Sequence, residues 1–107
     1  MRRRYSRDRK SWSERKRVWG HPYLGMRFHD IRRGFITITK AWKDRDFYWP
    51  CRTIGVRTSL TFEYVTDGGL RFVEEGSSLF PNVTFDDGSI PDEWMMVYGV
   101  PREAMRP

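Results

Sequence analysis

The sequence predicts a mainly β fold, a small barrel or sandwich of about five short strands, with a short basic helix near the N-terminus and a short helical turn near the C-terminus. Three observations predict it: apolar and polar residues alternate from Gly34 onward, acidic glycine-containing turns separate the alternating runs, and no long helical pattern interrupts them. The chain has 107 residues, of which 16% are aromatic. That is enough for one modest core.

The N-terminal segment, residues 1–20, is expected to be a basic arm, followed by a β-barrel domain over residues 21–107. Within the arm, Ser11 and Glu14 have the spacing of a capping box. We therefore expect about two helical turns over "WSERKRVW", ended by Gly20. This helix would carry the following residues on one face: Trp12, Arg15, Lys16 and Trp19. The two Trp side chains either anchor a partner or cover the open end of the barrel.

The remaining chain predicts short strands joined by turns. Residues 21–34 are expected to form a connector rich in glycine and proline. Strands are then expected at 35–42, 47–54, 56–65, 70–75 and 79–85. The residues "KDRD" at 43–46 predict a turn, and "TDGG" at 66–69 predicts an Asp-Gly hairpin. Pro50 cannot donate to a strand ladder, so its strand is expected at an edge or a bulge.

The tail predicts a short helical or 3₁₀ turn that packs Trp94 and Val97 on the barrel. Pro91 begins this turn as a helix start would, and Gly99 ends it. A last strand over "WMMVYGV" is the alternative.

Charge is unevenly distributed along the chain. Residues 1–33 contain twelve Arg and Lys side chains and three carboxylates, whereas residues 34–107 contain eight and eleven. Contacts to phosphates dominate nucleic-acid affinity, so a basic first third predicts contact with a nucleic acid or a nucleoprotein. Arg outnumbers Lys seven to two before Gly20. This favours phosphate contacts and stacking on rings.

The arm therefore supplies the candidate binding residues. Its cations are expected to neutralise phosphates: Arg2, Arg3, Arg4, Arg7, Arg9, Lys10, Arg15, Lys16 and Arg17. Its aromatic rings are expected to stack on unpaired bases: Tyr5, Trp12 and Trp19. The residues do not distinguish DNA from RNA.

The sequence predicts neither an enzyme nor a metal or cofactor site. Cys51 is expected to be a small buried side chain, and His21 and His29 lack the compact spacing of metal ligands. The acidic pairs Asp86-Asp87 and Asp92-Glu93 are typical of a tight turn and of a helix start. No catalytic residue is predicted.

The segments "GMRFHDIRRGFITITKAW", "TSLTFEYVTDGGLRF" and "NVTFDDGS" resemble the small SH3-like β-barrels, which include Tudor and KOW-type modules. The resemblance covers roughly residues 25–90 at the level of the fold and implies binding of RNA, DNA or peptides. An aromatic cage for a methylated cation would draw on Trp42, Phe47, Tyr48 and Trp49, but rings in a small barrel usually form its core. The chain also resembles short phage-encoded and actinobacterial proteins, which implies a viral or mobile-element origin.

The alternative function is a viral protein–protein interaction module that docks on a host machine or on another virion protein. In this hypothesis the arm meets an acidic protein surface, and the following side chains serve as exposed anchors: Trp12, Trp19, Trp94, Met95 and Met96. The single cysteine and the lack of a long apolar run predict a cytoplasmic protein without a membrane span, in the host cytoplasm if viral.

Overall fold

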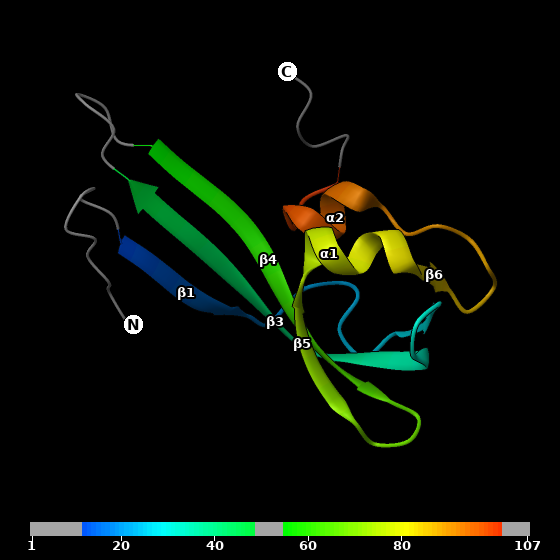
Figure 1. Cartoon of the computed structure of the whole chain (residues 1–107). Helices are drawn as coiled ribbons and strands as arrows, with labels where there is room; N and C mark the ends of the chain where they lie inside the picture. The colour runs from blue at the N-terminus through cyan, green and yellow to red at the C-terminus, as the bar shows by residue number, and fades with distance from the viewer. Residues whose placement is uncertain (1–11, 49–54, 102–107) are drawn as a thin grey trace.

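The computed structural model describes residues 12–48 and 55–101, which form six strands and three short helical segments (Figure 1). The strands are β1 (Trp12–Val18), β2 (Arg27–Asp30), β3 (Gly34–Tyr48), β4 (Gly55–Thr66), β5 (Arg71–Glu75) and β6 (Val83–Phe85). The helical segments are α1 (Gly76–Leu79), the 3₁₀ turn η1 (Phe80–Asn82) and α2 (Glu93–Val97). The fold is mainly β, as predicted.

The strands form one antiparallel sheet in the order β5-β4-β3-β2-β6. Strand β3 pairs with β4 along one edge. Its other edge is long enough for two partners: β2 pairs with residues 34–37 and β1 with residues 41–47. The sheet is open, and in the described part of the chain it does not close into the expected barrel.

The sheet therefore has two parts. The first part, the body, contains β2, β5, β6 and the adjoining halves of β3 and β4, with the helices against one side (Figure 1). The second part, which we call the ribbon, consists of β1, residues 41–48 of β3 and residues 55–62 of β4. Figure 1 shows the ribbon extending away from the helices. A bulge between Ile38 and Lys40 marks the junction, and bulges bend strands and increase their twist.

The core lies between the sheet and the helices. Its members are fully or nearly fully buried: Phe28, Ile36, Ile38, Ala41, Leu60, Phe62, Tyr64, Leu79, Val83 and Met96, with Tyr23 at the margin. Gly76 allows α1 to approach α2, because a Cβ at this position would collide with the Met96 carbonyl. The face of the sheet that contains Ala41 and Leu60 is the helix-side face; the opposite one is the outer face.

Two predictions about the first half of the chain are wrong. The segment that predicted a helix forms β1, which pairs with β3 over all seven residues. The "KDRD" segment, predicted as a turn, continues β3 without a break. An isolated two-turn helix is marginal in water, whereas a strand beside β3 satisfies its backbone groups along the ladder. The predicted connector likewise contains a strand, β2.

The turns and the tail largely agree with expectation. The Asp-Gly hairpin joins β4 to β5, where Thr66 N–H donates to the Leu70 carbonyl at 2.8 Å. The predicted strand at 79–85 is confined to Val83–Phe85, because the residues before it form the end of α1 and η1. The tail helix forms as α2, but it buries Met96 rather than Trp94 and Val97, which are half-buried.

Candidate nucleic-acid interface

The structure describes part of the predicted binding set. The following candidates lie outside the described residues: Arg2, Arg3, Arg4, Tyr5, Arg7, Arg9 and Lys10. Trp12 begins β1, which also contains Arg15, Lys16 and Arg17, and Trp19 follows directly. These residues lie on a flat strand, so they are divided between two faces instead of sharing one side of a helix.

Successive side chains of a strand point to opposite faces, and this alternation divides the charged residues of the ribbon between its two faces. On β3, Lys43 and Arg45 share the helix-side face with Ala41, whereas Asp44 and Asp46 lie on the outer face. On β1, Lys16 lies opposite Lys43 and therefore joins the helix-side face. The alternating "KDRD" thus places cations on one side and carboxylates on the other.

On the outer face, the carboxylates are occupied by partners from the same chain. Arg15 forms a bidentate pair with Asp44, at 2.6 Å between Nε and Oδ1 and 3.1 Å between Nη2 and Oδ2. The hydrogen bond to Asp44 raises the pKa of Arg15 above its ordinary value. Thr61 also donates to Asp44 at 2.6 Å, and Ser13 donates to Asp46 at 2.8 Å. The predicted phosphate ligand Arg15 is therefore neutralised within the ribbon.

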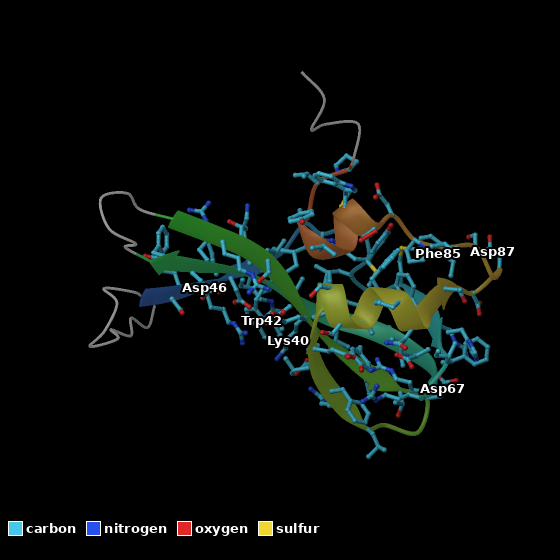
Figure 2. All side chains as sticks on the ribbon, turned by 45° about the horizontal axis from the view of Figure 1, so that its top comes forward. Lys40, Trp42, Asp46, Asp67, Phe85 and Asp87 are labelled. Atoms are coloured by element: carbon cyan, nitrogen blue, oxygen red, sulfur yellow. The ribbon has the colours of Figure 1, made fainter. Side chains whose placement is uncertain are left out.

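Arg17 lies between two indole rings on the outer face. Its guanidinium carbon is 4.2 Å from the Trp19 ring centre and 5.9 Å from that of Trp42. Figure 2 shows Trp42 near the body end of the ribbon, between Lys40 and Asp46. The Trp19 side chain is 76% exposed. Stacking on cations favours this arrangement by about 0.5–1 kcal/mol for each exposed contact.

On the helix-side face, three cations lie near one carboxylate, Glu14, which is directly opposite Arg45. Lys16 and Lys43 are directly opposite each other, and Arg45 lies next along β3. None of the three forms an ion pair with any residue of 12–48 or 55–101. Like charges directly opposite in a sheet destabilise it by about 0.2–1 kcal/mol. An anion on this face would relieve that repulsion.

Two small depressions adjoin on the helix-side face. The first is lined by Glu14, Arg15, Lys16, Lys43 and Arg45. The second is lined by Val18, Gly20, His21, Pro22, Lys43, Leu60, Tyr98, Gly99 and Val100. Lys43 belongs to both, so the depressions adjoin at this residue. We call the two together the basic groove and define it by Lys16, Val18, Lys43, Arg45 and Tyr98.

The C-terminal end of α2 forms one wall of the basic groove. Tyr98 is the C-cap residue, and its ring is 45% exposed and lies 5.0 Å from the Trp94 ring, centre to centre. Gly99 has a φ of 81° and lies close to Leu60 on the floor, where an added Cβ would be 3.1 Å from Leu60 Cδ1. This backbone conformation suits glycine and holds the wall close to the ribbon.

His21 connects the strand side of the groove to α2. Its Nδ1 accepts a hydrogen bond from the Tyr23 N–H at 3.0 Å, so the proton must be on Nε2. Nε2 then donates to the Met95 carbonyl at 2.8 Å. Burial lowers the pKa of His21 below its ordinary value, although the bond to Met95 opposes this. The neutral imidazole is a structural link, as expected for an ordinary histidine.

A larger depression of about 500 Å³ lies on the outer face of the ribbon. Its lining includes Asp44, Asp46 and Glu75 with Arg15. Because Arg15 is paired to Asp44, this surface has an excess of carboxylates and would repel a polyanion. This depression is larger than the two on the helix-side face, but its negative charge does not fit a nucleic acid.

A second charged cluster supports the fold of the body. Asp30 is fully buried and accepts hydrogen bonds from Arg32, which also pairs with Glu74 at 2.8 Å. Burial alone would raise the pKa of Asp30, but the bonds from Arg32 outweigh burial and lower it. Burial and the bond to Glu74 raise the pKa of Tyr64 to about 12. These charges are satisfied internally.

The acidic turns have the structural roles expected of them. Asp87 accepts hydrogen bonds from the Ser89 N–H and hydroxyl at 2.9 and 2.6 Å, and Asp92 caps α2 by accepting from the Trp94 N–H. Among the residues with described positions, no three of His, Cys, Asp and Glu gather as metal ligands. Cys51 lies outside the described ranges.

The proposed aromatic cage does not assemble from its described members. Trp42 and Phe47 are five residues apart on one continuous strand, so they lie on opposite faces. The Trp42 ring contacts Arg15 and Arg17 on the outer face. The side chain of Tyr48 and all of Trp49 lie outside the described part of the chain.

Sequence reasoning missed four groove residues: Lys43, Arg45, Tyr98 and Val18. The signal for the first two was the strict charge alternation of "KDRD", which has the period of a strand rather than of a turn. Tyr98 had no comparable local signal, since only the packing of α2 against the ribbon brings it to Lys43.

None of the helices in the described ranges is both long and apolar enough to cross a membrane. No family model matches the chain, and comparison with curated proteins and with solved structures gives no significant match.

Proposed function

We propose that this protein is a non-enzymatic nucleic-acid-binding module that holds the phosphate backbone in the basic groove and along the arm that precedes it. One observation carries the proposal: Lys16, Lys43 and Arg45 share one face and form no ion pair with any described residue. Cations without carboxylate partners are available to phosphates, and each one that binds releases counterions.

The position of β1 connects the groove to the rest of the basic segment. Lys16 of the groove lies six residues after Lys10, and residues 1–10 contain six Arg and Lys side chains. A backbone bound to the groove would therefore be within reach of further cations in the same chain. The SH3-like resemblance of residues 25–90 adds an analogy to nucleic-acid-binding barrels, and it is support of a weaker kind.

The test is a salt series with a matched pair of variants. Fluorescence anisotropy of a labelled oligonucleotide should show affinity falling steeply between about 50 and 200 mM salt. Lys43→Gln should weaken binding several-fold and reduce the slope of log K against log salt by about 0.7–0.9, because one phosphate contact is lost. Lys40→Gln removes the same charge from the outer face of the same strand (Figure 2) and should change neither quantity.

Two results would refute the proposal. One is an affinity that does not depend on salt. The other is an equal effect of Lys43→Gln and Lys40→Gln, because net charge rather than the groove would then explain binding.

Docking on an acidic protein surface is the second candidate, and the exposure of Trp19 favours it. The other described anchors fit it poorly, since Met96 is fully buried and Met95 packs against the core. If the purified protein does not bind oligonucleotides but retains one partner in fixed stoichiometry after nuclease digestion, this candidate replaces the first.

A further inference from the structure

We infer that the basic groove accepts a single strand, with phosphates at Lys16, Lys43 and Arg45 and an unpaired base stacked on Tyr98. This inference rests on the proposed function and specifies its substrate. Its basis is that cations line one depression and an exposed aromatic ring lines the adjoining one, and that Lys43 belongs to both.

The cations are spaced to follow an extended backbone. Lys43 and Arg45 are two residues apart on one strand, which places their Cα atoms roughly 6.6 Å apart. This is comparable with the separation of successive phosphates in an extended single strand. Lys16, opposite Lys43, doubles the charge at one of these positions. The row runs along the ribbon toward α2, where the second depression begins.

The exposed Tyr98 ring favours a single strand over a duplex. Duplex DNA presents phosphates to a flat basic face, whereas its bases remain stacked inside. An exposed ring at the end of a cation row is the arrangement by which proteins hold unpaired bases, since every base has a π-face. Val18 and Val100 border the same depression and provide apolar contacts for a base.

The backbone that carries Tyr98 is held in place before any ligand arrives. The Tyr98 N–H donates to the Trp94 carbonyl at 2.8 Å, and the Gly99 N–H donates to the carbonyls of Trp94 and Met95. His21 fixes Met95 from the other side of the groove. The ordered backbone and the neighbouring Trp94 ring limit the freedom that Tyr98 loses on binding, and this favours affinity.

The opposite face cannot take the same ligand. Its rings, Trp19 and Trp42, contact Arg17, but the adjoining surface carries Asp44, Asp46 and Glu75. A strand that stacked on these rings would place its phosphates beside carboxylates. The helix-side face combines a ring with unpaired cations and is therefore the better fit.

The experiment measures anisotropy of the full chain with labelled oligo-dT and with the same strand annealed to oligo-dA. The single strand should bind at least about tenfold more tightly than the duplex. Tyr98→Ala should weaken single-strand binding by about 5- to 100-fold and leave the salt slope unchanged, because no phosphate contact is lost. Tyr98→Phe should restore binding, whereas Tyr98→Leu, which keeps apolar bulk without a ring, should not. Phe35→Ala, which removes a half-exposed ring from the outer face, is the matched control and should have no effect.

The outcomes separate the two proposals. If the duplex binds as tightly as the single strand and Tyr98→Leu binds like the unsubstituted protein, the single-strand inference is wrong. Should Lys43→Gln still weaken binding in that case, nucleic-acid binding by the groove stands. If neither oligonucleotide binds, both proposals fall.

Discussion

The basic residues of this protein differ in their partners, and the partners determine their roles. Arg32 donates to Asp30 and Glu74, and these hydrogen bonds raise its pKa and use its charge inside the body. Arg15 is neutralised by Asp44 in the same way. Lys43 lies opposite a residue of its own sign, Lys16, and forms no ion pair with a carboxylate of the described residues. Such a cation retains its charge for a ligand.

At the residue scale, His21 predicts a dependence of stability on pH. The folded protein holds it neutral with a lowered pKa, whereas the unfolded chain binds a proton near the ordinary value of 6.5. Its contribution is therefore complete above pH 6.5, declines as the pH falls through that value, and levels off once the folded form is protonated. The urea midpoint should fall between about pH 7.5 and about pH 5.5.

Two variants test whether His21 causes this loss of stability. His21→Gln should abolish most of the difference in urea midpoint between the two pH values, and His29→Gln should preserve that difference. The carboxyls of Asp30 and Glu74 do not interfere, because their pKa values are lowered from ordinary values of 3.8 and 4.5, below this window. A midpoint that stays constant over the window would contradict the lowered pKa of His21 in the folded protein.

At the scale of elements, local patterns predicted those strands whose partners are close in sequence. The alternation of 56–65, the Asp-Gly turn and the return strand form a hairpin, so local information sufficed for β4 and β5. Strand β1 depends on β3, and its Arg15 pairs with Asp44, 29 residues away. The prediction followed the capping-box pattern and gave a helix, because no local feature of the sequence indicates that this segment pairs with β3.

The contact between α1 and α2 gives a second prediction. Gly76→Ala should destabilise the protein by roughly 1–3 kcal/mol, because the added methyl would overlap the Met96 carbonyl and press on Phe62. Gly20→Ala is the matched control, since nothing lies within 4 Å of its Cβ position and its φ is ordinary. Chemical denaturation checks both, and equal midpoints for the two variants would exclude the close approach of the helices.

At the scale of the whole molecule, the sequence predicted the fold class and the basic character but not the open sheet. Alternation shows which residues face a core, yet it does not show whether the first and last strands meet. Closure depends on twist and bulges, and here the bulge at Ile38 and Lys40 directs the ribbon away from the body (Figure 1). The basic groove forms where the ribbon leaves the body, beside the end of α2.

The sorting of charge between the two faces of the sheet is tested most directly by a face-swapped pair of triple variants. Lys16→Gln/Lys43→Gln/Arg45→Gln removes three charges from the helix-side face, and Arg27→Gln/Arg57→Gln/Arg71→Gln removes three from the outer face. The measurement is the slope of log K against log salt for oligo-dT. The helix-side variant should reduce the slope by about 2, since each lost phosphate contact contributes roughly 0.7. The outer-face variant should leave the slope nearly unchanged, and an equal reduction in both would contradict the assignment of the groove.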